Sequence, residues 1–347
     1  MDDPNALDTG VLAPYLEAEI AGFSGLQDIE KFASGQSNPT YLLRARSGRY
    51  VLRAKPPGQL LKSAHQVDRE YRVMKALRDT AVPVPAMLHL SDEASPIGRM
   101  FYVMGFVEGR IFWNPSLPEI ADNAGRSRIY DAMNRTLADL HGIDITKAGL
   151  ADHGRPGSYF ARQLARWSAQ YRATETARID DMDGLITWLE EHLPADDGQV
   201  ALVHGDYRLD NLVFAPDRPE IIAVLDWELS TLGHPYADLA YQCMQWRLPH
   251  DLDFGGLGGL GGLDRAAIGV PDEAAYVAAY CRRRGIAGIT GWNVFLAFSF
   301  FRLAAICQGV YKRALDGNAS NPERGIRHGD LVPVLTRLAA RLIDEGD

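Results

Sequence analysis

The first hundred residues hold short runs in which apolar and polar positions alternate. Between Phe32 and Arg53 the chain alternates as a half-buried strand does, and Ser47-Gly48 interrupts the run as a hairpin turn would. In "AHQVDREYRVMKALRDT" the apolar residues recur at helical spacing, and "VPVP" then ends the helix. Two more strand-like runs follow, "AMLHLSD" and "RMFYVMGFVEG". The pattern predicts a small antiparallel sheet with one inserted helix.

The pattern becomes helical after Asn123, and only the segment from Ala201 to Asp226 is typical of short strands. The composition shifts near Glu108. We therefore predict an α+β protein of two lobes. Residues 1–107 would form a sheet-rich N-lobe, and residues 108–347 a larger, mainly helical C-lobe.

The composition indicates a soluble globular protein, because 46% of the 347 residues are hydrophobic and 23% are charged. The formal net charge of -9 and the pI near 5.5 leave no basic surface for nucleic acid and no polybasic arm for a membrane. The apolar run from Val294 to Tyr311 is long enough to raise the question of a membrane span. Arg302 lies in its middle, so we predict a buried core helix instead.

The three cysteines, Cys243, Cys281 and Cys307, stand far apart in the sequence. Without a Cys-x-x-Cys pair they predict neither a zinc site nor a disulfide framework. The first ten residues are acidic and lack the basic start and apolar core of a signal peptide. These features favour the reducing cytoplasm.

The segment "HGDYRLDN", from His204 to Asn211, carries the strongest chemical pattern. An apolar strand ends at Asp206, which places this carboxylate in a loop. "NLVF" and "IIAVLD" are typical of two strands joined by a turn, so Asn211 and Asp226 should lie side by side at the end of a hairpin. One neutral and one anionic oxygen ligand together suit Mg²⁺. We expect the side-chain oxygens of Asp206, Asn211 and Asp226 to converge.

The same three residues match the parts of a phosphoryl-transfer site. Such a site needs a carboxylate for the attacking hydroxyl, and an Asn and an Asp for the metal ions that bridge the nucleotide phosphates. The kinase loop His-Arg-Asp-x-x-x-x-Asn also places its Asn five residues after its Asp, and "LDWE" stands where kinases have Asp-Phe-Gly. Turn or capping chemistry alone would explain each residue singly. Three coincidences at kinase spacing favour catalysis.

With these motifs the sequence resembles the aminoglycoside phosphotransferase and choline kinase-like family of small-molecule kinases, whose loop is typically His-Gly-Asp. The segments "GQSNPTYLLR", "YVLRAKPPG", "AHQVDREYRVMKAL", "LVHGDYRLDN" and "VLDWELSTLGHPYADLAY" look most like the phosphotransferase domains fused to acyl-CoA dehydrogenases. The resemblance covers residues 30 to 315. It implies a bilobal protein kinase-like fold and an enzyme that uses ATP and Mg²⁺ to phosphorylate a hydroxyl group of a small molecule.

The resemblance also implies roles for individual residues. Asp206 and Arg208 would be catalytic, the first as base or hydroxyl-orienting group and the second in contact with the transferred phosphoryl group. Asn211 and Asp226 would bind Mg²⁺. A phosphate loop, a strand cation with its helix partner, and an adenine hinge would hold the nucleotide: Ser34, Gly35, Gln36, Ser37, Asn38, Arg53, Glu70, Met104, Gly105 and Phe106.

Three features depart from the protein kinases. Arg53 replaces the usual strand lysine, although Lys55 on the same face could serve instead. The phosphate loop lacks Gly-x-Gly-x-x-Gly, and no Ala-Pro-Glu element follows Asp226, so a protein kinase is disfavoured. Arginine can hold phosphate bidentately, so Arg53 is compatible with activity. The alternative is a catalytically weak, pseudokinase-like module that only binds nucleotide.

The sequence leaves the identity of the phosphate acceptor open. The acidic cluster "IDDMDG" at 179–184 would attract a cationic aminoglycoside, whereas Arg302 and the arginines of neighbouring helices suit an anionic or acyl substrate. The resemblance to the fused domains implies a hydroxyacyl compound or its CoA thioester. The Gly-Gly-Leu repeat at 255–263 favours a flexible surface loop over a phosphate cradle, because no strand feeds it.

Residues around the loop have simpler predicted roles. His204 should hydrogen-bond the loop backbone, and Asp238 in "PYADLAY" should steady the loop from the following helix. His141 should pack at a helix end. Glu228 either approaches a second metal ion or faces solvent. Three tryptophans should be core or pocket wall: Trp167, Trp246 and Trp292.

Overall fold

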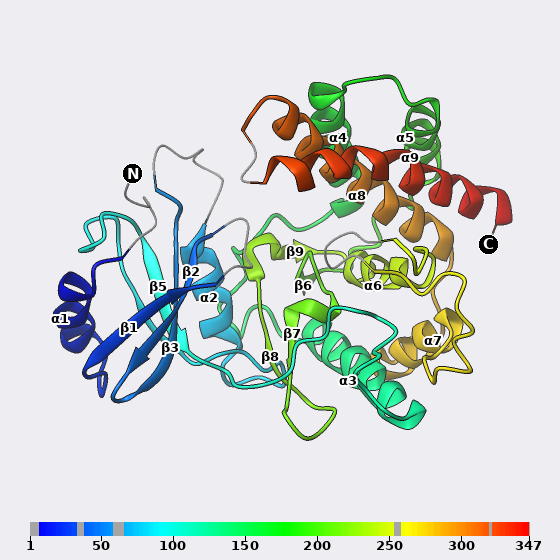
Figure 1. Cartoon of the computed structure of the whole chain (residues 1–347). Helices are drawn as coiled ribbons and strands as arrows, with labels where there is room; N and C mark the ends of the chain where they lie inside the picture. The colour runs from blue at the N-terminus through cyan, green and yellow to red at the C-terminus, as the bar shows by residue number, and fades with distance from the viewer. Residues whose placement is uncertain (1–6, 33–37, 58–65, 253–257, 319–320, 347) are drawn as a thin grey trace. The chain divides into compact units, whose positions relative to one another are not determined.

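A computed structural model describes residues 7–32, 38–57, 66–252, 258–318 and 321–346 (Figure 1). The chain divides into two compact units. The first comprises Met1–Arg110, Thr146–His153 and Asn211–Ser230, and the second comprises Ile111–Ile145, Gly154–Asp210 and Thr231–Asp347. The predicted N-lobe, residues 1–107, lies within the first unit, which also gathers the later segment with Asn211 and Asp226.

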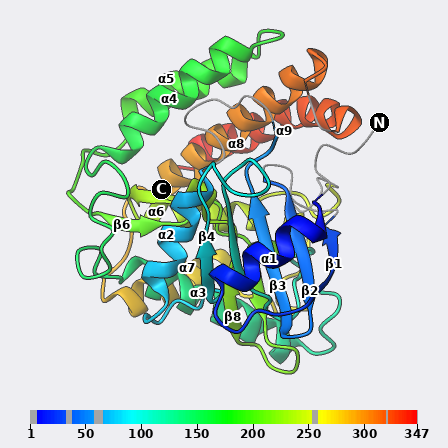
Figure 2. The same cartoon turned by 90° about the vertical axis from the view of Figure 1, so that its left-hand side faces the viewer.

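The first unit is built on an antiparallel sheet of five strands in the order β1-β2-β3-β5-β4; β5 is labelled in Figure 1 and β4 in Figure 2. Its strands are β1 (Leu26–Lys31), β2 (Thr40–Ala45), β3 (Gly48–Ala54), β4 (Met87–Leu90) and β5 (Phe101–Gly105). The β2–β3 hairpin closes where Ala45 pairs with Gly48, as the sequence predicts. Strand β1 is an edge strand that the sequence pattern did not predict.

Two helices pack on this sheet. Helix α1 (Thr9–Glu19) buries Leu12 and Leu16 against one face (Figure 2), and each buried leucine stabilises the fold by about 1.5–3 kcal/mol. The sequence pattern missed α1 because Pro14 lies inside it. Helix α2 (Val67–Leu77) was predicted, and its Glu70 contacts Arg53 of β3. Side chains alternate along a strand, so Arg53 points away from its α1-facing neighbour Leu52.

The second unit is mainly helical, as predicted for the later part of the chain. Its helices are α3 (Asn123–His141), α4 (Tyr159–Thr174), α5 (Asp180–His192), α6 (Tyr236–Cys243), α7 (Glu273–Arg284), α8 (Trp292–Leu315) and α9 (Pro322–Glu345). Asp122 and Asp272 cap α3 and α7 by accepting N–H bonds from their first turns. Strands β6 (Ala201–Val203) and β9 (Thr231–Gly233) form an antiparallel pair.

Helix α8 contains the apolar run for which a core helix was predicted. Within the described ranges it is the single helix long and apolar enough to cross a membrane. Its most apolar window is nevertheless 78% buried inside the protein, where α8 packs against α4, α6 and α9. The run therefore forms a core helix, and Arg302 within it is buried.

The Gly-Gly-Leu repeat is described from Gly258 onward, and residues 255–257 lie outside the described residues. Leu260 is fully buried, and its N–H donates to the carbonyl of Gln245 at 2.7 Å. A Cβ on Gly259 would come within 1.8 Å of the Leu248 carbonyl oxygen, so backbone packs directly on backbone. Gly259 and Leu260 are therefore buried and not part of a surface loop, whereas Gly262 is exposed as predicted.

The three tryptophans lie where the sequence predicts, in the core or in a pocket wall. Trp167 and Trp246 are buried. Trp246 and Trp292 also line a cavity of about 990 Å³ beside α7. The cysteines are buried and unpaired.

Candidate active site

In the first unit, one guanidinium lies among three carboxylates, here called the Arg53 cluster: Arg53, Glu70, Asp226 and Glu228. Arg53 Nε lies 3.2 Å from Glu70 Oε2, and Arg53 Nη2 lies 2.6 Å from Asp226 Oδ1 and 3.5 Å from Glu228 Oε2. Burial opposes the charge of Arg53, but Glu70 and Asp226 hold its pKa above the usual value. The contact between Arg53 and Glu70 that the resemblance implied is formed.

Glu70 is the fully buried member of the Arg53 cluster. Tyr102 donates its hydroxyl to Oε2 at 3.1 Å, and Asn38 donates its amide to Oε1 at 3.0 Å. The pKa of Glu70 is raised to about 8. Burial is the largest cause, Arg53 opposes it, and the carboxylates of Asp226 and Glu228 add to it. The cluster holds more acidic groups than one arginine can neutralise, so it is suited to attract a further cation.

Lys55, the alternative strand cation, has a different partner. Its Nζ pairs with Glu93 Oε1 at 2.6 Å, just beyond the end of β3. Arg53 instead occupies the position beside Glu70. The sequence left open whether Arg53 or Lys55 takes the place of the kinase strand lysine. The contact with Glu70 favours Arg53.

Asn211 and Asp226 lie at one end of the hairpin formed by β7 (Leu212–Phe214) and β8 (Ile221–Val224). The Leu225 N–H donates to the Asn211 carbonyl at 2.9 Å, so the chain positions of the two predicted metal ligands are neighbours, as expected. Asp226 has φ 65° and ψ 59°, a left-handed conformation that costs a non-glycine residue about 1–3 kcal/mol and is common at functional sites. The convergence of Asp206 with these residues stays a prediction.

The donors at this end of the hairpin fit Mg²⁺. One amide, one carboxylate and the excess acidic groups of the Arg53 cluster provide the oxygen ligands and the negative charge that this hard ion prefers. No cluster of three or more His, Cys, Asp or Glu side chains forms a ready-made metal site in the described ranges. Asn211 and Asp226 would therefore depend on water and phosphate oxygens to complete the coordination.

The predicted phosphate loop and adenine hinge are only partly described. Ser34, Gly35, Gln36 and Ser37 lie outside the described residues, whereas Asn38 joins the Arg53 cluster through Glu70 and Glu228. Met104 and Gly105 end β5, and Phe106 follows them. The N–H groups of Gly105 and Phe106 donate to protein carbonyls at 2.9 and 3.2 Å. Their role toward adenine stays a prediction.

In the second unit, the predicted catalytic loop, here residues 204–210, begins directly after β6. Asp238 on α6 accepts the His204 N–H at 2.6 Å with Oδ2 and the Gly205 N–H at 2.8 Å with Oδ1. The Asp206 N–H donates to His204 Nδ1 at 3.2 Å. Gly205 has φ 84°, which glycine adopts without a steric penalty. The predicted supporting roles of Asp238 and His204 are confirmed.

A buried histidine supports Asp238 in turn. His141 Nε2 lies 3.3 Å from Asp238 Oδ2, and His141 Nδ1 lies 2.7 Å from the Tyr280 hydroxyl. A neutral His141 with its proton on Nε2 satisfies both contacts. Burial opposes ionisation of Asp238, but bonds from His141 and Gly205 hold the pKa of its carboxyl below the usual value. The loop is thus held by charge-assisted hydrogen bonds.

Asp206 itself is flanked by an arginine and a tyrosine. Arg208 Nε lies 3.5 Å from Asp206 Oδ1, and Arg208 Nη2 pairs with Asp210. Burial raises the pKa of Tyr241, and its hydrogen bond to Asp206 contributes to that shift. The sequence analysis missed Asp210 and Tyr241. Tyr241 could have been found, since it follows Asp238 by three residues on a helix and so shares its face.

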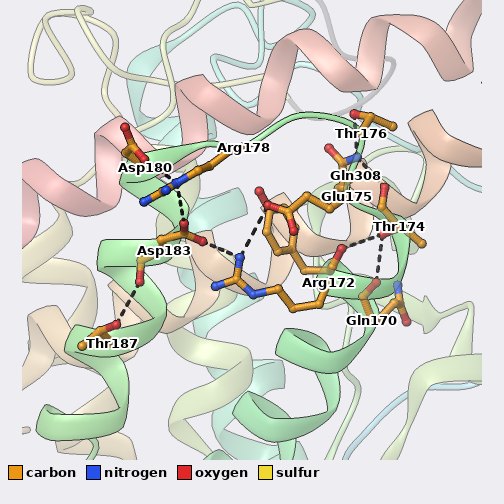
Figure 3. Close-up of polar contacts among 11 residues, drawn as sticks. Gln170, Arg172, Thr174, Glu175, Thr176, Arg178, Asp180, Asp183, Thr187 and Gln308 are labelled. Atoms are coloured by element: carbon orange, nitrogen blue, oxygen red, sulfur yellow. Dashed lines mark hydrogen bonds and ion pairs between the residues drawn. The ribbon is translucent and has the colours of Figure 1, made fainter.

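The acidic cluster at 179–184 forms the start of α5, and arginines of the same helical hairpin neutralise part of it (Figure 3). Arg172 pairs with Asp183, and Arg178 Nε lies 2.8 Å from Asp180 Oδ1 and 3.3 Å from Asp183 Oδ2. Gln308 ties the same turn to α8 by donating to the Thr174 carbonyl at 2.7 Å. These internal ion pairs reduce the charge available to a polycation.

Residues 28–298 match the model of the phosphotransferase enzyme family, APH. The chain belongs to this family. Mouse (Mus musculus) acyl-CoA dehydrogenase family member 10 is 46% identical to it over 317 residues, which are 91% of this chain and 29% of the mouse protein. The chain spans less than half the length of the curated relatives it matches.

Solved structures agree with this assignment. A crystal structure of a protein from Ralstonia eutropha JMP134, provisionally named an aminoglycoside phosphotransferase, is 45% identical with a TM-score of 0.87 and covers 99% of this chain and 100% of that one. A spectinomycin phosphotransferase in complex with ADP and spectinomycin is 12% identical with a TM-score of 0.64 and covers 97% and 98%, which shows the fold alone. The predicted kinase-like α+β fold is confirmed. Membership of this family identifies the protein as a phosphotransferase.

Proposed function

We propose that this phosphotransferase transfers the γ-phosphoryl group of ATP, in the presence of Mg²⁺, to the hydroxyl of a hydroxyacyl compound or its CoA thioester. The geometry of the catalytic loop carries the proposal. Asp206 follows two residues whose N–H groups Asp238 holds at 2.6 and 2.8 Å, and Asn211 follows five residues later. A fixed carboxylate at this spacing suits in-line phosphoryl transfer.

In the proposed mechanism Asp206 accepts the proton of the acceptor hydroxyl. The hydroxyl oxygen forms a bond to the γ-phosphorus while the bond from phosphorus to the leaving ADP oxygen breaks. Arg208, held by Asp210, contacts the phosphoryl group during transfer. Because the loop backbone is already fixed by hydrogen bonds, Asp206 needs little reorganisation to act.

The nucleotide is proposed to bind through the first unit. Arg53, oriented by Glu70, contacts the phosphates, and Asn211 and Asp226 hold Mg²⁺. When bound, the ion neutralises charge on the phosphate oxygens. The use of a nucleotide is supported by the spectinomycin phosphotransferase of the same fold, which is named in complex with ADP.

The proposed acceptor rests on the relatives and on charge. The mouse relative is named as an acyl-CoA dehydrogenase family member, and this chain is 46% identical to a part of it. The acidic cluster that would attract an aminoglycoside is partly neutralised by Arg172 and Arg178.

The experiment is a turnover assay with a panel of acceptors. The purified protein is mixed with ATP and Mg²⁺ and with hydroxycarboxylates, their CoA thioesters, choline or aminoglycosides, while ADP release and phosphorylated product are measured. We expect turnover with a hydroxyacyl acceptor, loss with EDTA and recovery with added Mg²⁺. Turnover with aminoglycosides alone would show that the acceptor is an aminoglycoside and not a hydroxyacyl compound. Binding of ATP without product from any acceptor would contradict the proposal and indicate a nucleotide-binding module.

A further inference from the structure

Arg302 is a buried cation in the middle of the apolar helix α8. The residue is 6% exposed, and no carboxylate of the described residues pairs with it. Its guanidinium lies over the rings of Tyr241 and Trp167, 5.2 and 5.9 Å from the two centroids. Arginine keeps its charge even when buried, and a buried charge without a counter-charge is costly. Other interactions of Arg302 must therefore offset the free-energy cost of burying its charge.

The hydrogen bond of Arg302 indicates which part of the protein it stabilises. Its Nη2 donates to the Gly205 carbonyl at 2.7 Å. On the other side of the same peptide group, the Asp206 N–H donates to His204 Nδ1 at 3.2 Å. Both polar atoms of the Gly205–Asp206 peptide plane are thus bonded. Because the peptide group is planar, these two bonds fix its orientation and with it the position of the Asp206 Cα, from which the side chain extends.

A second connection runs through Tyr241. This residue hydrogen-bonds to Asp206, and its ring lies under the Arg302 guanidinium. A cation over an aromatic ring is attracted by the negative face of that ring, so Arg302 also holds the ring that carries the hydroxyl. Arg302 therefore reaches Asp206 by two routes, one through the backbone and one through a side chain.

We infer that Arg302 is a positioning residue that sets the orientation of Asp206 for proton transfer. The inference rests on the proposed function for its effect on turnover. Asp238 holds the N–H groups of His204 and Gly205, while Arg302 holds the carbonyl that follows them. The loop is consequently fixed from α6 on one side and from α8 on the other.

The test compares three variants. Arg302→Met removes the hydrogen bond and the charge, Arg302→Lys keeps the charge and one donor, and Arg313→Met makes the same change at an exposed position of the same helix. We expect Arg302→Met to lower kcat by about 10- to 100-fold, with both KM values within about threefold, because a misplaced group slows the chemical step. Arg302→Lys should lower kcat by about 3- to 10-fold, and Arg313→Met should match the unmodified protein.

Hydrogen exchange gives a reading that needs no substrate. In Arg302→Met, peptides covering residues 201–208 should exchange faster than in the unmodified protein and in Arg313→Met, whereas peptides from α7 should be unchanged. If the unmodified protein phosphorylates no acceptor, the proposed function fails, and the exchange data still decide whether Arg302 fixes the loop.

Three results would overturn the inference. The first is kcat within twofold of the unmodified protein in a folded Arg302→Met variant. The second is a raised acceptor KM with unchanged kcat, which would show that Arg302 binds the acceptor. The third is unchanged exchange at residues 201–208. If Arg302→Met does not melt cooperatively, Arg302→Lys decides by the same criteria.

Discussion

The two units of the protein differ in the balance of acidic and basic side chains at their predicted functional residues. In the first unit one guanidinium, Arg53, contacts three acidic side chains. In the second unit the carboxylates of Asp206 and Asp210 lie beside Arg208, and Arg302 holds the same loop. The Arg53 cluster therefore has one arginine for three acidic groups, whereas two arginines and hydrogen bonds from the backbone N–H groups of the loop offset the carboxylates of Asp206, Asp210 and Asp238.

This difference suggests that the Arg53 cluster needs a bound cation to balance its charge, whereas the loop after β6 is stable without a ligand. A cluster with excess carboxyl groups becomes stable when a cation binds, so its protonation and its ligand occupancy should change together. The predicted catalytic loop is held by hydrogen bonds and ion pairs that need no ligand, so we propose that it keeps the carboxylate of Asp206 in place. Changes in the loop should affect the chemical step, and changes in the cluster should affect metal and proton binding.

The largest expected effect tests the loop side of this comparison. Asp206→Asn removes the group that accepts the proton and should lower kcat by about 10²-fold or more. The Mg²⁺ concentration needed for half-maximal turnover should stay the same. Asp217→Asn, at an exposed turn position, is the control. Unchanged turnover in Asp206→Asn would remove Asp206 from the mechanism.

The next effect tests the cluster side. Asp226→Asn removes the single anionic ligand proposed for Mg²⁺ and should raise the Mg²⁺ requirement by about 10-fold or more. Steady-state turnover measured across a Mg²⁺ titration gives the value. If Asp226→Asn and Asp206→Asn gave the same Mg²⁺ response, the division of roles between the two units would be wrong.

Features with a short sequence period or fixed spacing could be predicted. The β2–β3 hairpin and α2 follow from alternation and helical spacing. Asn211 and Asp226 were placed together because two apolar runs flank one turn. Helix α1 could not be predicted in this way, because Pro14 interrupts the expected helical composition.

The contacts that depend on distant packing could not be predicted. Arg302 and Gly205 are separated by 97 positions, and no local pattern links them. The apolar run of α8 indicated only that the helix is buried, so Arg302 could be read as a charge but not as a support for the loop. The ion pairs of the 179–184 cluster also depend on how α4 and α5 fold back on each other. The roles assigned to the nucleotide-binding residues stay predictions.

The pH dependence of stability offers a smaller effect, again on the cluster side. The pKa of Glu70 is raised from 4.5 to about 8, first by burial. The folded state therefore binds a proton that the unfolded state releases, and this contribution is complete below about pH 4.5 and lost as the pH rises through 8. Melting curves should show Tm falling between pH 5 and 8, and the fall should be smaller in Glu70→Gln. Glu119→Gln, at an exposed position, should behave as the unmodified protein; an identical fall in all three would contradict the role of Glu70.

The smallest expected effect concerns Glu228, for which the sequence left two roles open. Its carboxylate lies 3.5 Å from Arg53 and 3.4 Å from the Asn38 amide, and 23% of its side chain is exposed. Because Glu228 raises the pKa of Glu70, Glu228→Gln should move the pH-dependent fall of Tm to lower pH. We expect kcat to change by about threefold or less, since such a partly exposed charge is partly screened by solvent. A fall of tenfold or more that extra Mg²⁺ restores would instead make Glu228 a metal ligand, and the excess carboxyl groups of the Arg53 cluster would then serve two ions.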